Sequence, residues 1–516
     1  MLRDLAVGLL AALTISAAWW MPGSIPCALL GWITAGLLVW IAWRARYAYS
    51  ASFLSGFMIH PLAFYWLYGA IRSFGGFPPL GAAAVFGLFA AVSGLQYPIF
   101  IFIFRALPKY FDGIACRTAI AWTVSEFTSL RLFPWCLGHT QLAVTPFAQA
   151  ASLGGSYFLT FLMMWLAESV LRVRWKTLSL RIASIPATVI AALTIYGAVL
   201  VHQFKAEPPA TNSVALIQAN VSIDEKHDIS LLTIDRDRYV QLSLQALKPG
   251  MLIVWPESVI EDFIPDSVGS AINEPLLPYW QGSYTSFLVG ALTYRSEQEM
   301  YNSAVAVYRD GTVPPPYHKR ILMPFGEYTP FGETFPWLKE LDGLLGAFTP
   351  GTKPVVFAYP MNPKSDEHLN VSPLICYEDV VPRLSREAVA EGAEVLANLT
   401  NDAWFGNTVA PYQHHLIATF RAIENHRYLI RSTNTGFTAI VNPLGATTVK
   451  LPPYTEGIAY GAVAPYSDRT VYSVIGDLPW WALSALTALL IVLRWFVKRY
   501  VIERVMKWYQ HSKPQT

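Results

Sequence analysis

Long apolar runs dominate the N-terminal part of the chain and return once near its end. A helix needs about 20 apolar residues to cross the hydrocarbon core of a bilayer. Eight spans of this kind are predicted, with approximate bounds 4–20, 26–43, 50–71, 80–104, 113–130, 145–170, 182–203 and 478–496. The pattern therefore predicts a multi-pass α-helical membrane domain over residues 1–207. A last span and a basic tail are predicted within 476–516.

Residues 208–475 show a different pattern, in which short apolar strands alternate with helical segments and turns rich in Pro or Gly. Strands are predicted at 213–221, 251–255, 286–294, 301–308, 371–377, 393–399, 429–433, 437–441 and 447–451, and helices at 231–247, 382–390 and 412–427. Strands mixed with helices in one stretch predict a layered α/β domain whose sheets are covered by helices.

The composition fits this division. Charged residues make up 14% of the 516 residues, against roughly 25% in soluble domains, and the deficit falls in the apolar blocks. The chain is therefore predicted to be an integral membrane protein with one large water-exposed domain. The stretch Met1–Met21 would also suit a signal peptide, but a second apolar block follows within a few residues, so we interpret it as an uncleaved first span.

The basic residues predict an orientation. They gather after every second predicted span, at Arg44, Arg46, Arg105, Lys109, Arg117, Arg172, Arg174, Lys176, Arg181, Arg494, Lys498, Arg499, Arg504 and Lys507. Because positive loops stay in the cytoplasm, both termini are expected inside and the 208–475 domain outside, in the periplasm of a bacterial inner membrane. A formal net charge of +2 without a basic stripe argues against nucleic-acid binding.

Three ionisable residues stand at or just beyond hydrophobic or turn-forming stretches of the exported domain. Glu257 follows Val-Trp-Pro, Lys319 lies in Tyr-His-Lys-Arg, and Cys376 ends the apolar run Leu-Ile-Cys. A lone strand cysteine is often only a packing residue. A carboxylate, an ammonium and a thiol brought to one edge of a sheet, however, are the groups that covalent catalysis requires.

These segments, together with Pro-Phe-Gly-Glu ending at Glu327 and Asn-Asp-Ala-Trp-Phe-Gly over 401–406, resemble the nitrilase, or carbon–nitrogen hydrolase, superfamily. With its eight spans, the whole chain resembles the bacterial apolipoprotein N-acyltransferase family. The resemblance implies a four-layer αββα sandwich on a membrane base. It also implies transfer of an acyl chain from a phospholipid to the N-terminal amine of a diacylglyceryl-modified apolipoprotein, by a monomer without cofactor or metal.

The resemblance assigns roles to the three residues. Cys376 would attack the lipid ester and carry the acyl chain as a thioester. Glu257 would act as the general base. Lys319 would stabilise the thiolate and the tetrahedral oxyanion, and its charge would lower the pKa of the thiol.

Five further residues match supporting positions of the family: Glu327, which would orient the lysine, and Glu378, Tyr377, Asn302 and Trp404. Surface acids, a turn residue and a core aromatic are the structural alternatives for these side chains.

Two rival functions remain open at this level. A membrane-tethered amidase of the same superfamily would hydrolyse a small amide without any lipid. A transporter would need polar groups within the membrane, and only Glu126 and His60 offer them. Glu126 is either functional or an interhelical hydrogen-bonding residue, while His60 is expected to make a polar packing contact.

Three further features of the sequence allow more than one interpretation. Cys27 and Cys136 both lie near outer ends of predicted spans, where an oxidising compartment would allow a disulfide. His414 and His415 are adjacent, so on a helix they point about 100° apart and do not share a metal-binding face. The apolar segment 335–349 either tucks into the domain or dips as an arm into the outer leaflet.

Overall fold

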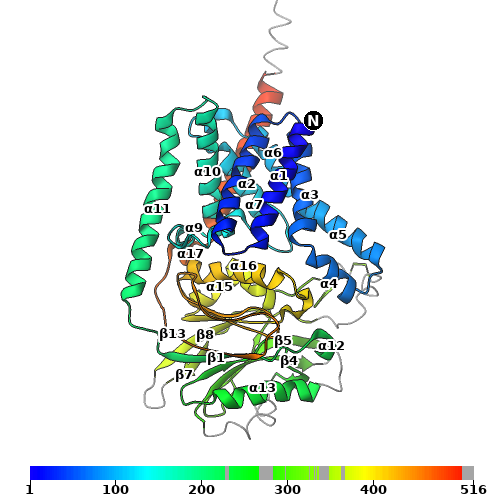
Figure 1. Cartoon of the computed structure of the whole chain (residues 1–516), viewed down its shortest axis with the longest axis vertical. Coiled ribbons are helices and arrows are strands. Elements are labelled where there is room, and N and C mark those ends of the chain that lie inside the picture. Colours follow the sequence, from blue (N-terminus) through cyan, green and yellow to red (C-terminus); the bar gives the residue numbers. More distant parts are fainter. Residues whose placement is uncertain are drawn as a thin grey trace, which may run out of the picture.

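The computed structural model describes residues 1–226, 232–266, 283–296, 298–324, 326–329, 332, 334–335, 348–361 and 367–502. A bundle of helices stands on a layered block of sheets (Figure 1). The long helix α11 (Leu180–Ala206) leads the chain from the bundle to the sheets, and α18 (Leu478–Phe496) returns it to the bundle.

The helical half contains, besides these two, α1 (Leu2–Trp20), α2 (Ile25–Arg44), α3 (Ala48–Ala63), α4 (Trp66–Phe74), α5 (Pro79–Gly94), α6 (Gln96–Ala106), α7 (Arg117–Thr128), α8 (Thr145–Ala148), α9 (Ala151–Gly154) and α10 (Ser156–Arg174). In the described part of the chain, 6 helices are long and apolar enough to cross a membrane, with α5 and α6 counted as one. The number rises to 7 if α3 and α4, which are bent by 66° at their junction, form one span. The multi-pass architecture is thus confirmed, with about the predicted number of spans.

Two predicted spans take a different form. The span at 113–130 is realised as α7, whose 12 residues are too few to cross a bilayer and are almost all buried within the bundle. The span at 145–170 is broken into α8, α9 and α10. The break before α10 falls at Gly155. Its φ of 74° lies in a region that glycine adopts readily and other residues rarely do. A Cβ at this position would also lie only 2.7 Å from the Tyr472 ring.

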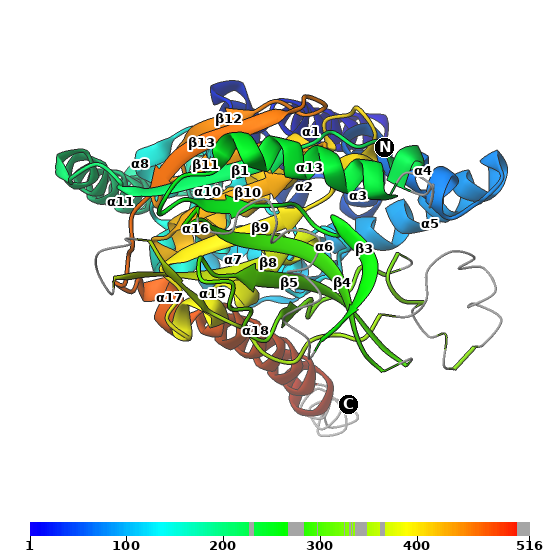
Figure 2. The ribbon, with the colours of Figure 1, turned by 90° about the horizontal axis from the view of Figure 1, so that it is seen from below.

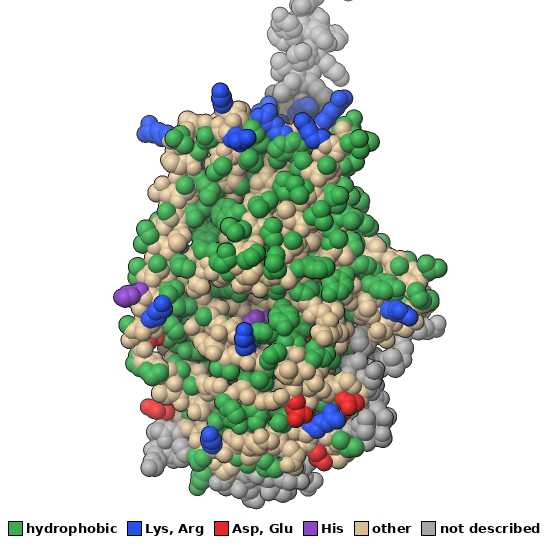
Figure 3. All heavy atoms as spheres, viewed as in Figure 1, with side chains coloured by type: hydrophobic (Ala, Val, Ile, Leu, Met, Phe, Trp, Pro, Cys, Tyr) green, Lys and Arg blue, Asp and Glu red, His purple; other side chains and the backbone are tan. Residues whose placement is uncertain are grey.

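Basic side chains gather at the end of the bundle that carries the N-terminus, while the flanks of the bundle are largely apolar (Figure 3). Several of these cations lie over indole rings: Arg44 is 4.5 Å from the Trp175 ring centre, and Arg172 is 4.6 Å from that of Trp43. Trp and Arg side chains of this kind are typical of a membrane–water interface. The distribution of charge therefore divides the bundle into one basic end and one end that meets the sheets.

The polar residues singled out within the bundle make packing contacts. Glu126 is fully buried and accepts a hydrogen bond from the backbone N–H of Leu137 at 2.9 Å. Nδ1 of His60 lies 2.8 Å from the carbonyl oxygen of Gly56, one helical turn earlier. Cys27 and Cys136 are both free thiols, so the disulfide that the sequence left open is not formed.

Two sheets follow the bundle. The described strands are β1 (Asn212–Gln218), β2 (Leu252–Val254), β3 (Ile260–Pro265), β4 (Ser286–Ser296), β5 (Glu299–Val307), β6 (Tyr317–His318), β7 (Phe357–Pro360), β8 (His368–Ile375), β9 (Val395–Thr400), β10 (Tyr428–Thr433), β11 (Thr438–Val441), β12 (Thr447–Leu451) and β13 (Gly457–Val463). One sheet has the order β13-β1-β2-β4-β5-β6, with β3 beside β4, and the other has the order β12-β11-β10-β9-β8-β7.

The two sheets face each other across an apolar core, in which Val254 and Leu288 of the first meet Val371 and Leu399 of the second. Helix α13 (Leu232–Ala246) covers the outer face of the first sheet, as the view from below shows (Figure 2). Helices α15 (Pro382–Ala390) and α16 (Ala410–Asn425) cover the second. The resulting αββα sandwich confirms the predicted fold.

Helix α16 lies between the second sheet and the bundle (Figure 1). Its Ala418 packs toward the sheet, whereas Leu416 and Phe420 belong to the apolar core of the bundle. A tryptophan of the bundle fixes the helix further, since Nε1 of Trp66 donates to Oε1 of Gln413 at 3.0 Å. The αββα sandwich is therefore packed directly on the helical bundle rather than tethered to it by a linker.

Candidate active site

Glu257 and Lys319, far apart in sequence, form an ion pair next to the end of the first sheet. Glu257 lies in the turn after β2, and Lys319 directly follows β6. The Nζ of Lys319 donates to Oε1 of Glu257 at 3.0 Å and to Oε1 of Glu327 at 2.9 Å. Asn302, on β5, donates from Nδ2 to the same two oxygens, at 2.8 Å each. One ammonium and one amide thus hold two carboxylates in fixed positions.

The lysine is 2% exposed. Burial on its own would lower the pKa of Lys319, but the charges of Glu257 and Glu327 outweigh it and raise that pKa well above its usual value. The side chain is therefore a permanent ammonium. A fixed cation in a water-poor site is suited to stabilise negative charge that develops beside it.

Cys376 stands where β8 ends and a 3₁₀ turn (η5, Cys376–Val380) begins. Its φ is 51°, in the left-handed region that few non-glycine residues adopt and that clusters at functional sites. The thiol interacts electrostatically with both Glu257 and Lys319. The structure thus brings together the three residues that the sequence analysis selected.

The pKa of the Cys376 thiol reflects opposing effects. Burial raises it well above its usual value, the charge of Glu257 raises it further, and the opposing effect of Lys319 is smaller. Lys319 thus lowers the thiol pKa, as its charge predicts, but desolvation outweighs this effect. The resting group is a thiol, and a nearby base has to remove its proton.

The two residues after the cysteine hold its turn in place. The Glu378 carboxylate is fully buried and accepts hydrogen bonds from the Tyr317 hydroxyl at 2.7 Å and from the backbone N–H of Arg320 at 2.6 Å. It thereby ties the cysteine turn to the segment that carries Lys319. The Tyr377 hydroxyl donates to the carbonyl oxygen of Leu132, in the membrane half.

Two other features singled out in the sequence, Trp404 and the segment 335–349, are not part of the ion-paired cluster described above. Trp404 lies half-buried in a short 3₁₀ helix (η6, Asp402–Phe405), directly beside Phe405, whose ring packs at 4.7 Å on that of Trp66. Most of the apolar segment 335–349 lies outside the described residues.

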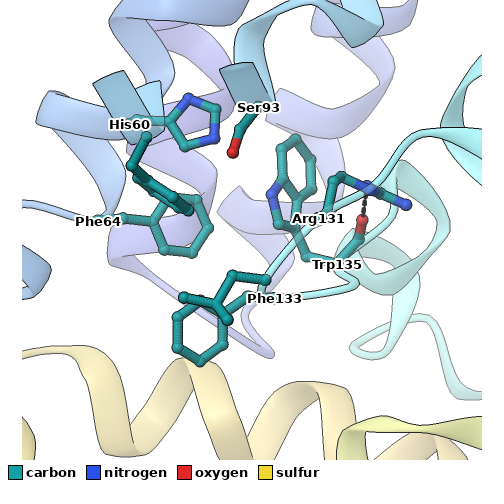
Figure 4. A pocket seen from close by; sticks show the side chains of 8 residues that line it. His60, Phe64, Ser93, Arg131, Phe133 and Trp135 are labelled. Atoms are coloured by element: carbon teal, nitrogen blue, oxygen red, sulfur yellow. Dashed lines mark hydrogen bonds between the residues drawn. The ribbon is translucent and has the colours of Figure 1, made fainter. Parts of the chain in front are cut away.

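A small pocket opens near the contact between Phe405 and Trp66, on the side of the membrane helices (Figure 4). Its lining is aromatic and cationic, and consists of His60, Phe64, Phe89, Ser93, Arg131, Leu132, Phe133 and Trp135. Arg131 donates to the carbonyl oxygen of Trp135, as the dashed line in Figure 4 marks. The ring of Phe133 lies 6.1 Å from that of Tyr377, so the pocket adjoins the residue that follows the nucleophile.

Sequence reasoning missed a buried ionic cluster behind the cysteine turn. His414, on α16, lies 2.7 Å from a carboxylate oxygen of Asp379 and 2.9 Å from one of Asp402. Asp379 also accepts from Nε of Arg431 at 3.1 Å. The sequence suggests only a metal-ligand role to test for His414, since the pairing with two distant aspartates has no local signal. Among the residues that the structure describes, no group of three or more His, Cys, Asp or Glu side chains is arranged to hold a metal ion.

This cluster predicts a pH-dependent stability. Burial would lower the pKa of His414, but Asp379 and Asp402 raise it from 6.5 to about 9. The stabilisation is therefore complete below about pH 6.5 and is lost as the pH rises through about 9, with a total of roughly 3 kcal/mol. We expect the difference in unfolding temperature between the parent and His414→Gln to shrink from pH 6.5 to 9.5. A difference that is constant over this range would contradict the prediction.

A glycine lies behind the base. A Cβ at Gly290, on β4, would stand 2.1 Å from the carbonyl oxygen of Pro256 and 2.7 Å from Cα of Glu257. The Gly290→Ala substitution should therefore displace Glu257 and lower the rate of the reaction at this site by about 10²-fold. Gly457→Ala, on β13, meets only ordinary contacts at 3.6 Å and is the matched control. Equal rates for the two variants would show that the position of Glu257 is not critical.

Each half of the chain is similar to a known protein family. The carbon–nitrogen hydrolase family matches residues 213–470, and the family of the apolipoprotein N-acyltransferase N-terminal domain matches residues 7–168. An apolipoprotein N-acyltransferase of Bradyrhizobium diazoefficiens is 33% identical over 402 residues, which are 74% of each chain. The chain belongs to the apolipoprotein N-acyltransferase family. The family member of Geobacter metallireducens is 28% identical over 496 residues, 93% of each chain.

Membership in the apolipoprotein N-acyltransferase family accounts for both halves of the molecule. The two family matches lie on the helical bundle and on the αββα sandwich. The residues of the ion-paired cluster, from Glu257 to Cys376, all fall inside the carbon–nitrogen hydrolase match. Apolipoprotein N-acyltransferases are thus similar to this chain in the membrane base as well as in the domain that bears the cysteine.

Proposed function

We propose that this membrane enzyme transfers an acyl chain from a phospholipid, through a thioester on Cys376, to the N-terminal amine of a diacylglyceryl-cysteine on an apolipoprotein. The observation that carries the proposal is the buried Lys319 ammonium between two carboxylates, with electrostatic coupling to Cys376. A nucleophile, a base and a fixed cation are the parts that a two-step acyl transfer needs. The membrane base provides access to both lipid substrates.

In the first step, the Glu257 carboxylate removes the proton of the Cys376 thiol as the sulfur attacks the ester carbonyl of the phospholipid. Lys319 stabilises the oxyanion of the tetrahedral intermediate. The intermediate collapses, the ester C–O bond breaks, and Glu257 returns the proton to the alkoxide of the leaving lysophospholipid. The acyl chain remains on the sulfur.

In the second step, Glu257 accepts a proton from the incoming ammonium, and the free amine attacks the thioester carbonyl. The C–S bond breaks and an amide forms. Glu257 gives its proton to the sulfur, which restores the thiol, and the second proton of the amine is lost to solvent, so that Glu257 is again a carboxylate. The raised pKa of Cys376 fits this role, because the thiol regains its proton readily. Glu327 and Asn302 would act through Lys319 and Glu257 by fixing their positions.

The proposed topology follows the charge distribution. The basic end of the bundle would face the cytoplasm of a bacterial inner membrane, and the sandwich the periplasm. Residues 1–207 would form the membrane base, 208–475 the catalytic domain, and 476–516 the last span with its tail. The pocket beside Tyr377 faces the membrane half, which supports an approach of the lipid from that side.

Mass spectrometry tests the reaction directly. Protein purified from native membranes and incubated with phospholipid should gain the mass of one acyl chain, mapped to the Cys376 peptide and released by hydroxylamine. Addition of a diacylated lipopeptide should discharge the acyl chain onto its amine. An acyl chain that never forms on Cys376 would refute the proposal. Release of ammonia from soluble amides without lipid would instead indicate the amidase.

A further inference from the structure

His414 makes two charged contacts at once. Its Nδ1 lies 2.9 Å from Oδ1 of Asp402, and its Nε2 lies 2.7 Å from Oδ1 of Asp379. A different oxygen of Asp379, Oδ2, accepts from Nε of Arg431 at 3.1 Å. Because carboxylates only accept hydrogen bonds, both ring nitrogens have to donate. The side chain is therefore an imidazolium held between two anions.

The two aspartates belong to the two turns of the active site. Asp379 lies in η5, three residues after Cys376. Asp402 begins η6 and directly follows Asn401, whose backbone N–H donates to Oε2 of Glu257 at 3.2 Å. One imidazolium thus links the turn that bears the nucleophile to the turn that contacts the base.

The helix that carries His414 is itself fixed on the membrane half. The neighbouring Gln413 donates from Nε2 to the carbonyl oxygens of Trp19, at 2.9 Å, and Ala63, at 3.0 Å. On the other side of the cluster, Nε of Arg431 donates to Oδ1 of Asn398 at 3.3 Å, and Nδ2 of Asn398 donates to the carbonyl oxygen of Cys376 at 3.1 Å. The position of the imidazolium is therefore determined by contacts that do not involve any substrate.

We propose that His414 is a positioning residue, which as an imidazolium sets the spacing between Cys376 and Glu257 for transfer of the thiol proton. The inference rests on the proposed acyl transfer and adds a residue to it. Without the imidazolium, Asp379 and Asp402 would repel each other and the two turns would move apart. A displacement of about 1 Å in such a site costs about 10²-fold in rate.

The test compares His414→Gln with His426→Asn. Glutamine keeps a donor but loses the charge and the second contact. His426, at the end of the same helix, pairs with the exposed Asp468 at 2.7 Å and has a left-handed backbone that asparagine tolerates. In single-turnover acylation by a fluorescent phospholipid, His414→Gln should be about 10²-fold slower with KM changed less than about twofold. The control should match the parent.

A second measurement does not depend on acyl transfer. Alkylation of Cys376 by iodoacetamide, followed by peptide mapping, reports the pKa of the thiol. Loss of the imidazolium leaves the charge of Asp402 unbalanced, and that charge already raises the thiol pKa. The alkylation profile of His414→Gln should therefore move to higher pH by about one unit. If the parent is alkylated in this way but forms no thioester, the proposed function fails while the role of His414 is still tested.

Folding is controlled with Asp402→Asn, whose amide oxygen still accepts from Nδ1 of His414. This variant should keep at least a tenth of the parent rate. If His414→Gln unfolds, Asp402→Asn carries the test: loss of the Asp402 charge should move the alkylation profile to lower pH, while the retained hydrogen bond keeps the rate of acylation within about tenfold of the parent rate. A folded His414→Gln enzyme with parental acylation and alkylation, or Asp402→Asn as inactive as His414→Gln, would overturn the proposal.

Discussion

The Cys376→Ser enzyme is expected to lose acyl transfer by roughly 10⁴–10⁶-fold, as enzymes do when their nucleophile is removed. The cysteine thiol already has a pKa well above its usual value in this buried site. A hydroxyl is a much weaker acid than a thiol, so Glu257 would not deprotonate it. The measurement is the rate of acyl transfer from phospholipid to a diacylated lipopeptide, with the thioester followed by mass spectrometry.

The substitution should leave the fold unchanged. Serine has nearly the shape of cysteine and meets the same backbone strain at a φ of 51°. An unfolding temperature close to that of the parent is therefore the control. In cells that contain only the serine variant, lipoproteins should remain diacylated. Fully triacylated lipoprotein in such cells would rule out Cys376 as the nucleophile.

Lys319→Met should remove both activity and stability. The substitution leaves Glu257 and Glu327 buried without the ammonium that both contact within 3.0 Å. Loss of one partner of a buried ion pair costs about 3–5 kcal/mol, and loss of an oxyanion donor costs about 10²–10³ in rate. Chemical unfolding and the transfer assay measure the two effects separately. Lys450→Met, at an exposed position of β12, is the control.

A double substitution separates the two roles of this lysine. Glu327→Gln removes one of the two stranded carboxylates, so adding it to Lys319→Met should recover part of the stability. Activity should not return, because the cation is still missing. If Lys319→Met proves as stable as the parent, the two glutamates are not held as an ionised pair around Lys319.

The positions of candidate site residues could be predicted from the sequence where a strand delivers the residue directly. Glu257 and Cys376 stand at or just beyond the ends of the apolar strands β2 and β8, and a run of buried residues followed by an ionisable one is visible in a single chain. The same reasoning located α15 and β12 at their predicted bounds. Strand β6 has only two residues and shows no periodicity, so it was missed.

The features that the sequence did not predict depend on contacts between distant segments of the chain. His414 is separated from Asp379 by 35 residues, and the pairing has no local signal. The broken helix at Gly155 reflects the approach of Tyr472 from the far end of the chain. The sequence indicated that the charge of Lys319 lowers the thiol pKa of Cys376, but not the larger effect of desolvation, which depends on how the fold surrounds the sulfur.

Helix α16 sets a limit on how this enzyme can be studied. Its Leu416, Ile417 and Phe420 are buried against the helices of the bundle, and the Tyr377 hydroxyl bonds to a loop of that bundle. A fragment without the membrane helices would expose this apolar face of α16 to water. It would also free the Tyr377 side chain, which directly follows the nucleophile, from its contact with the bundle. Purification therefore has to preserve the interface between the helical bundle and the sandwich. We expect the choice of detergent to affect the measured rate of acyl transfer.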